Sequence, residues 1–85
     1  MAEVTIYTTD HCPYCVKAKQ LLNIKKQKFT EFDIEKDSAA HEELMKKLPT
    51  ARTVPQIFIN GKSIGGCDDL HSLNDKGELD ALLAI

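Results

Sequence analysis

The stretch TTDHCPYCVKAK, residues 8–19, sets Cys12 and Cys15 three positions apart and places Pro13 directly after the first cysteine. Before it, EVTIY (residues 3–7) alternates polar and apolar residues and is rich in strand-forming types, which predicts a β-strand. After it, apolar residues recur on one helical face: Cys15, Ala18, Leu21 and Leu22. Pro13 suits the first position of a helix, where its missing N–H costs nothing, so we expect Cys12 to cap that helix.

The middle of the chain predicts a strand, a helix and a hairpin. FTEFDIE, residues 29–35, is typical of a strand, although its alternation is imperfect. Asp37 or Ser38 is expected to cap a second helix, which Pro49 ends. The apolar residues of this helix are Leu44, Met45 and Leu48. VPQIFI, residues 54–59, is a short apolar run typical of a buried strand. Asn60-Gly61 then signals a tight hairpin turn, so KSI (residues 62–64) is expected to pair back as the last strand.

The C-terminal part predicts a helical region from about Asp68, after the break at Gly65-Gly66 and with an interruption near Gly77. Its expected inward-facing residues are Leu70, Leu73, Leu79, Leu82 and Leu83. The full order is therefore β-α-β-α-β-β-α. A strand, a crossover helix and a strand form a right-handed parallel unit, to which the hairpin adds antiparallel strands. The predicted fold class is α/β, with a four-stranded mixed sheet that helices cover on both faces.

Length and composition limit the classes of function. A chain of 85 residues predicts one domain, residues 1–85, with a modest core. A net charge of −2 argues against a nucleic-acid groove, which needs a basic excess. We expect no membrane span, because no apolar run approaches the roughly 20 residues required. The N-terminal residues lack the pattern of a signal peptide, so we expect a cytoplasmic protein. In that compartment a close cysteine pair is catalytic or binds metal rather than forming a structural disulfide.

Metal and haem sites fit the cysteine pair poorly. A structural zinc site uses four ligands, commonly two pairs at short spacing. This chain offers one pair and the distant Cys67, while its histidines are scattered: His11, His41 and His71. A c-type haem signature requires histidine directly after the second cysteine, and this position is Val16. No metal is therefore expected.

Redox chemistry fits the pair better. Residues at i and i+3 of a helix share a face, so the two sulfurs can form a small disulfide ring. The unpaired N–H groups and partial positive charge of a helix N-terminus stabilise a thiolate, which is expected to lower the pKa of Cys12. Cys15 lies one turn deeper, so Cys12 should attack and Cys15 should resolve. Lys17 and Lys19 are the only lysines near enough in sequence to raise the local potential. A dyad between His11 and Cys12 is a weaker alternative, because adjacent residues at a helix start need not point at each other.

Three segments together resemble the glutaredoxin family, a group with a thioredoxin-like fold. They are CPYC (12–15), TVPQIFI (53–59) and GGCDDL (65–70), in the order in which the family has them. The resemblance runs from Val4 to about Leu83 and is similar to the small bacterial dithiol type. It implies a glutathione-dependent oxidoreductase with Cys12 and Cys15 as catalytic residues.

The resemblance also implies a glutathione site. Its residues would be Tyr14, Arg52, Thr53, Val54, Pro55, Gly66, Cys67 and Asp68. The backbone of Val54, before a cis-Pro55, would bind the cysteinyl part of glutathione as a short antiparallel strand. N–H groups at Gly66, Cys67 and Asp68 would bind the γ-glutamyl carboxylate, and the Asp68 carboxylate would pair with the γ-glutamyl amine.

Other positions in or near this site are less clear-cut. Arg52, the only arginine, would face the glycyl carboxylate, although a lone arginine is commonly a solvated surface residue. Tyr14 would be an exposed aromatic beside the cleft. Cys67 is expected to be a small buried hydrophobe, with a third reactive thiol as the alternative. Thr9 departs from the family, which often has Lys or Arg three residues before the first cysteine.

The implied function is reduction of protein disulfides through Cys12 and Cys15, and of protein–glutathione mixed disulfides through Cys12 alone. Glutathione would be the reducing co-substrate. The expected partners are disulfide-containing or glutathionylated proteins, with ribonucleotide reductase as one candidate, and the expected state is a monomer. Two alternatives stay open at this point. One is an electron donor reduced by thioredoxin reductase, and the other is an iron–sulfur carrier that binds a cluster through Cys12 and glutathione.

Overall fold

The computed structural model describes residues 2–83 of the chain. Its elements, in order, are β1 (Val4–Thr8), α1 (Pro13–Ile24), β2 (Thr30–Asp33), α2 (Ser38–Lys47), β3 (Gln56–Ile59), β4 (Lys62–Gly65), α3 (Cys67–Asp75) and α4 (Glu78–Leu83). The strands form one sheet in the order β2-β1-β3-β4. β1 is parallel to β2 and antiparallel to β3, and β4 is antiparallel to β3. The predicted mixed sheet and element order are confirmed.

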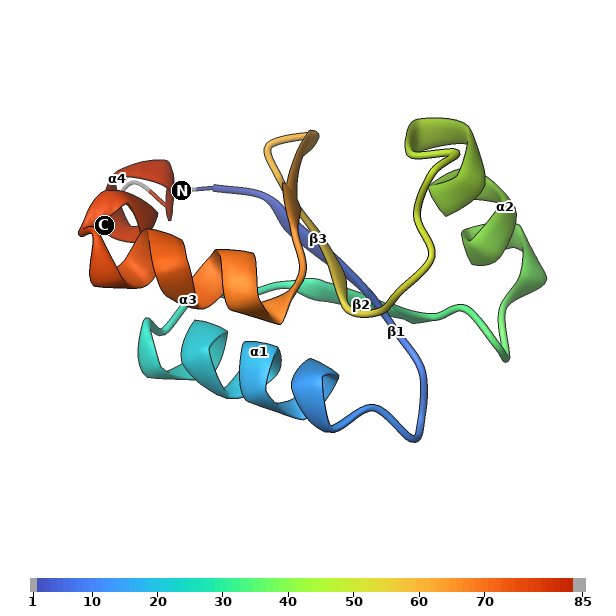
Figure 1. Ribbon diagram of the computed structural model, residues 1–85, viewed down its shortest axis with the longest axis horizontal. Helices are drawn as coiled ribbons and strands as arrows, with labels where there is room; N and C mark the ends of the chain where they lie inside the picture. Colours follow the sequence, from blue (N-terminus) through green and yellow to red (C-terminus); the bar gives the residue numbers. More distant parts are fainter. Residues whose placement is uncertain (1, 84–85) are drawn as a thin grey trace.

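Helices cover both faces of the sheet, as Figure 1 shows: α1, α3 and α4 lie on one side, and α2 lies on the other. The side with three helices buries the larger core. Val4 and Ile6 of β1 and Ile57 and Ile59 of β3 point into it, because alternate residues of a strand face the same side. The helices contribute Ala18, Leu21, Leu22, Cys67, Leu70, Leu79 and Leu83 to the same cluster.

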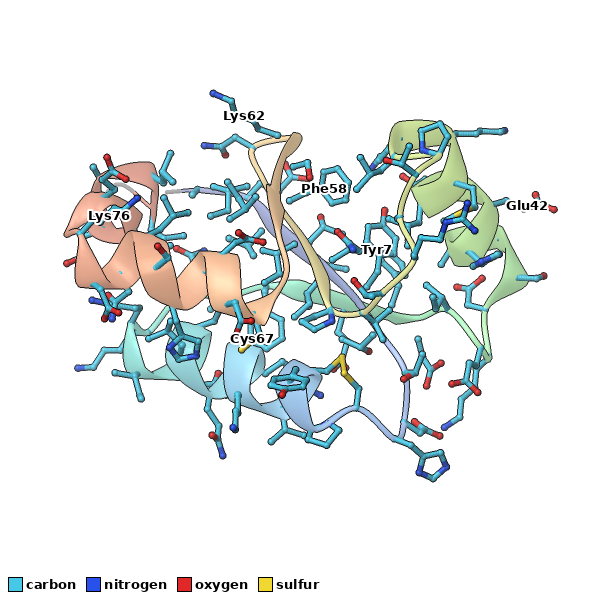
Figure 2. All side chains as sticks on the ribbon, viewed as in Figure 1. Tyr7, Glu42, Phe58, Lys62, Cys67 and Lys76 are labelled. Atoms are coloured by element: carbon cyan, nitrogen blue, oxygen red, sulfur yellow. A yellow bond between two sulfur atoms is a disulfide. The ribbon has the colours of Figure 1, made fainter. Side chains whose placement is uncertain are left out.

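The α2 side holds a smaller aromatic core. Tyr7 of β1 and Phe58 of the neighbouring strand β3 project toward α2 (Figure 2) and pack with Leu44. The Tyr7 and Phe58 rings meet edge to face with centroids 5.8 Å apart, a favourable arrangement for aromatic pairs. Asp37 begins α2 as predicted, since its Oδ1 accepts the Ala40 N–H at 3.1 Å. None of the helices within residues 2–83 has the length and apolar character needed to cross a bilayer.

Turns and strand ends differ in how well the sequence predicts them. Asn60 and Gly61 have φ values of 53° and 81°, which is the left-handed geometry of the predicted hairpin turn. β2 is shorter than expected, because the Asp33 carboxylate accepts the N–H groups of Glu35 and Lys36 and turns the chain. β3 begins at Gln56 and not at residue 54, since Pro55 has no N–H to donate to a sheet.

Candidate functional site

Cys12 is the N-cap of α1, as the sequence predicts. Its backbone is extended, and its sulfur accepts the N–H of Cys15 at 3.1 Å. Pro13 occupies the first helical position, and the first turn of α1 contains no acidic residue. A disulfide joins Cys12 and Cys15, whose Cα atoms lie 5.1 Å apart. Cys15 is only 1% exposed whereas Cys12 is partly exposed, so Cys12 is the sulfur that a reaction partner can reach.

The three segments singled out in the sequence meet around Cys12. The Cys12 sulfur lies 3.5 Å from the backbone oxygen of Val54, which precedes Pro55. The peptide bond between these two residues is cis, as expected. Gly66 lies close to this bond in space. A side-chain carbon added at Gly66 would stand 3.4 Å from the Pro55 carbonyl oxygen. Segments that are about 40 residues apart in the chain therefore share one surface beside the disulfide.

The start of α3 differs from the expectation in one hydrogen bond. Gly66 is the N-cap, and its N–H donates to the Asp69 carboxylate at 3.0 Å. This N–H was expected to serve a ligand carboxylate. The next N–H groups, at Cys67 and Asp68, belong to the first turn, where a helix offers no internal acceptor. Both groups are donors that α3 can present to an anion.

A hollow of about 250 Å³ adjoins the Val54 side of this surface. Arg52, Thr53 and Val54 line it from the loop before β3, and Thr9 lines it from the loop after β1. Its floor is apolar, formed in part by Leu44, Met45 and Ala51. His41 of α2 is exposed and also lines it. No spacing rule could reveal this position, because it depends on how α2 packs against the loop.

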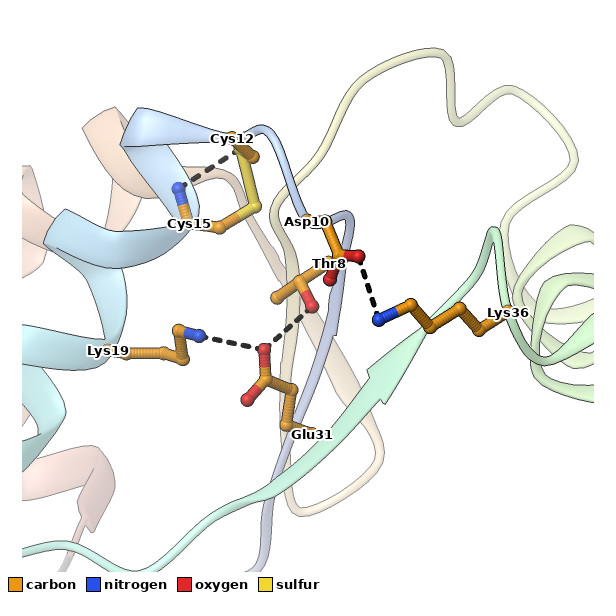
Figure 3. Close-up of polar contacts among 7 residues, drawn as sticks. All are labelled: Thr8, Asp10, Cys12, Cys15, Lys19, Glu31 and Lys36. Carbon is orange, nitrogen blue, oxygen red and sulfur yellow. Dashed lines mark hydrogen bonds and ion pairs between the residues drawn. A yellow bond between two sulfur atoms is a disulfide. The ribbon is translucent and has the colours of Figure 1, made fainter.

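Charged groups near Cys12 form pairs (Figure 3). The Glu31 carboxylate of β2 accepts hydrogen bonds from the Thr8 hydroxyl and from the Lys19 ammonium, each at 2.8 Å. The hydrogen bond from Lys19 is the main cause that holds the pKa of Glu31 below its ordinary value. The Lys36 ammonium lies 2.7 Å from Asp10 and, together with Asp33, lowers the pKa of Asp10. Lys19 is one of the two lysines close enough in sequence to raise the potential at the thiols, but its ammonium pairs with Glu31.

The other two predicted neighbours of the site are Tyr14 and Cys67. Tyr14 is 56% exposed, as expected, and the ammonium of Lys17 lies 5.4 Å from its ring centroid. Cys67 is a free, buried cysteine at the first position of α3, where Figure 2 shows it facing α1. Burial, and next the nearby Asp68, raises the pKa of the Cys67 thiol. These properties match the expected small hydrophobe and not a reactive thiol.

Metal ligation has no support within residues 2–83. This part of the chain contains no group of three or more His, Cys, Asp or Glu side chains that could hold a metal ion.

Comparison with known proteins identifies close relatives. The family model described as Glutaredoxin matches residues 4–64. Glutaredoxin 3 of Escherichia coli K12 is 51% identical over 83 residues, which cover 98% of this chain and 99% of that protein. A probable glutaredoxin of Synechocystis is 48% identical over 83 residues, covering 98% of this chain and 76% of the relative.

Solved structures agree with these relatives. The dithiolic glutaredoxin of Trypanosoma brucei brucei superposes with a TM-score of 0.81 at 40% identity, covering 94% of this chain and 84% of that one. The buckwheat glutaredoxin–glutathione complex gives a TM-score of 0.84 at 27% identity, with 95% and 76% of the two chains covered.

Proposed function

Since this chain belongs to the glutaredoxin family and is a thiol–disulfide oxidoreductase, we propose that Cys12 and Cys15 carry its reaction and that glutathione supplies the electrons. The observation that carries the proposal is the position of the Cys12 sulfur. It caps α1, accepts the Cys15 N–H at 3.1 Å and lies 3.5 Å from the Val54 backbone oxygen. The helix N-terminus stabilises the thiolate, and the neighbouring Val54 backbone is proposed to bind the cysteinyl part of glutathione.

With a protein disulfide as substrate, both cysteines act. The Cys12 thiolate attacks one sulfur of the substrate, forms a mixed disulfide and releases the other sulfur as a thiolate, which takes a proton from solvent. The Cys15 thiolate then attacks Cys12, frees the second substrate sulfur and leaves the Cys12–Cys15 disulfide that the structure contains. Two glutathione molecules restore the dithiol and leave as oxidised glutathione. Each round transfers two electrons to the substrate.

With a protein–glutathione mixed disulfide, Cys12 suffices. Its thiolate attacks the glutathione sulfur and releases the protein thiol, so the glutathionyl group is now bound to Cys12. The thiolate of a second glutathione attacks that group, and oxidised glutathione leaves. This route returns Cys12 to the thiolate without using Cys15.

The glutathionyl group is proposed to lie across the surface that joins the three segments. The Val54 N–H and C=O, between Thr53 and Pro55, pair with its cysteinyl backbone. Arg52 faces its glycyl carboxylate from the lining of the hollow of about 250 Å³. The N–H groups of Cys67 and Asp68 bind its γ-glutamyl carboxylate, and the Asp68 carboxylate binds its γ-glutamyl amine. Gly66 lets α3 approach Pro55 closely, and Tyr14 borders the cleft.

Several finer features belong to the same proposal. All the segments of the site come from one chain, which supports action as a monomer within a single domain. Disulfide-containing and glutathionylated proteins are the substrates, with ribonucleotide reductase as a candidate among them. The cytoplasm is the proposed location, because cellular glutathione keeps thiols reduced there.

The experiment that tests this function measures turnover of a glutathionylated peptide with two alternative reductants. We expect rapid turnover with glutathione, recycled by glutathione reductase and NADPH, and little with thioredoxin reductase and NADPH. Cys12→Ser should abolish turnover in both assays. The opposite reductant preference would favour the electron donor reduced by thioredoxin reductase, and a coloured cluster after anaerobic purification with glutathione would favour the iron–sulfur carrier.

A further inference from the structure

Exposed apolar side chains gather beside the reactive sulfur. In the described part of the chain, Tyr14 is 56% exposed and Val16 is 49% exposed, and both lie within four residues of Cys12. Pro13, between Cys12 and Tyr14, is exposed as well. Single exposed apolar residues are ordinary, but several at one place are typical of a surface that another molecule covers.

A second hollow, of about 320 Å³, opens directly beside Cys12. Cys12, Pro13 and Val16 line it from the start of α1, and Asp10 and His11 line it from the preceding loop. Pro13 and Val16 are three positions apart on the helix, so they share a face. None of the residues proposed to bind glutathione is part of this lining. Cys12 therefore borders a recess that the glutathione site does not use.

The charge at the rim of this hollow is already matched. The Asp10 carboxylate lies 2.7 Å from the Lys36 ammonium, toward which Figure 3 shows it turned. Because Asp10 is paired, the hollow offers the apolar surface of Pro13 and Val16 rather than a free carboxylate. Its surface therefore suits an apolar side chain better than a cation.

Disulfide geometry identifies the molecule that brings this side chain. Two cysteines joined by a disulfide have Cα atoms roughly 4.4–6.8 Å apart. When a substrate sulfur is bonded to Cys12, the substrate backbone is therefore held close to the hollow that Cys12 lines. A residue adjacent to the substrate cysteine lies only about 3.3 Å further along an extended chain. Its side chain can thus reach Pro13 and Val16.

We propose that the hollow lined by Pro13 and Val16 is a docking site for an apolar side chain next to the cysteine of a protein disulfide; this inference rests on the proposed function. The Cys12 thiolate bonds to the sulfur of the docked half, and the other half leaves as a thiolate that takes a proton from solvent. Cys15 then attacks Cys12 and frees the docked half. Glutathione has no such side chain, so the hollow favours protein disulfides alone.

The test uses three disulfides of one short peptide with a single cysteine. Two are symmetric dimers, with leucine on both sides of the cysteine in one and serine on both sides in the other. The third joins the serine peptide to glutathione. Reduced protein in excess reacts once with each disulfide, and acid quenching followed by chromatography gives second-order rate constants. Rates with dithiothreitol, which has no docking surface, correct for the intrinsic reactivity of each disulfide.

Wild-type protein is expected to reduce the leucine dimer about fivefold faster than the serine dimer after this correction, the scale of burying part of an apolar side chain. Equal rates would overturn the inference. A normal rate with the glutathionylated peptide would then leave the proposed function standing. Failure to reduce the glutathionylated peptide would instead contradict the proposed function itself.

Val16→Ser is expected to lose most of the preference for leucine. Its rate with the glutathionylated serine peptide should stay within about twofold, since that substrate brings no apolar neighbour to the hollow. Val16→Ile keeps an apolar, β-branched side chain and should keep the preference. A preference that survives in Val16→Ser, or is lost equally in Val16→Ile, would show that the apolar surface of the hollow does not hold the leucine.

Ile24→Ser is the matched control. Ile24 is also an exposed apolar residue of α1, 75% exposed, but it is the last residue of the helix and is not part of the hollow. This variant should keep the wild-type preference for leucine. If Ile24→Ser loses the preference as Val16→Ser does, the effect is one on the helix as a whole and the docking site is refuted.

Discussion

At the scale of single residues, three cysteines of one small chain occupy three different environments. Cys12 is a partly exposed helix cap, Cys15 is 1% exposed, and Cys67 is a free, buried cysteine. Because the thiolate is the reactive form, exposure together with stabilisation of the anion decides which sulfur reacts. Cys12 alone among them combines both properties.

Alkylation of the reduced protein should follow this order. At neutral pH, iodoacetamide is expected to modify Cys12 at least tenfold faster than Cys67, whose thiol has a raised pKa and little access to solvent. Peptide mapping by mass spectrometry after timed quenching gives the three rates separately. Equal rates at Cys12 and Cys67 would show that the helix N-terminus does not activate the first thiol.

Arg52 and Asp68 offer a second prediction at this scale. Replacing either with Ala should raise the KM for a glutathionylated peptide several-fold and change kcat much less, since both are proposed to hold ligand ends remote from the sulfur. Steady-state kinetics with saturating glutathione provides the measurement. Lys62→Ala, an exposed change in the β3–β4 hairpin (Figure 2), is the control and should alter neither constant. A fall in kcat at constant KM would argue against this placement.

At the scale of elements, α1 is what makes the cysteine pair a functional unit. The helix holds Cys15 one turn after Cys12 on the buried face, so the resolving thiol needs no encounter with a second molecule. Pro13 starts the helix directly after Cys12, which leaves the sulfur at the cap.

Cys15→Ser should therefore separate two activities. Reduction of a glutathionylated peptide is expected to survive at wild-type level or above, because Cys15 can no longer divert the Cys12–glutathione intermediate into the internal disulfide. Reduction of the insulin disulfides should fall by at least tenfold, since an intermolecular step must replace the resolving thiol. Equal loss of both activities would refute the route that uses Cys12 alone.

The elements themselves could largely be predicted from the sequence, because their signals are local. Alternation marked β1 and, imperfectly, β2, and a short apolar run marked β3. Asn60-Gly61 marked the hairpin, and Gly77 marked the interruption between α3 and α4. Strand ends were harder: Asp33 ends β2 through its side chain, and Pro55 delays β3 by lacking an N–H. These ends depend on single hydrogen bonds that periodicity does not report.

At the scale of the whole molecule, packing brings together what sequence distance separates. The candidate site could be predicted in its three segments because each carries a distinctive motif. The pairing of Lys19 with Glu31, the hydrogen bond between Asp69 and Gly66 and the place of His41 in the hollow could not. They arise from side chains that meet only after the helices pack on the sheet.

The Thr8–Glu31–Lys19 contacts tie α1 to two strands and predict a pH-dependent contribution to stability. Folding lowers the pKa of Glu31, so its contribution is complete above the unfolded value of about 4.3 and is lost as the pH falls through the lower folded value. Glu31→Gln should cost at most about 1 kcal/mol at pH 7, because the side chain is more than a third exposed. The difference from wild type should shrink below about pH 4.

Urea denaturation at pH 7 and pH 3 measures this difference. Glu42→Gln, on the exposed surface of α2 (Figure 2), is the control and should show no comparable change between the two pH values. A Glu31→Gln penalty that is as large at pH 3 as at pH 7 would mean that the ionised carboxylate is not the stabilising form.

The central claim is that the segments around Cys12, Val54 and Cys67 form one glutathione groove. The most direct measurement compares amide NMR shifts of Cys15→Ser carrying either a glutathionyl or a cysteinyl group on Cys12. Both adducts share the new disulfide, so their difference reports only the γ-glutamyl and glycyl ends. We predict shift differences at Arg52, Val54, Cys67 and Asp68, and none at Lys62. Identical shifts at the start of α3 and beside Val54 would contradict the account, because the ligand would then be held by its sulfur alone.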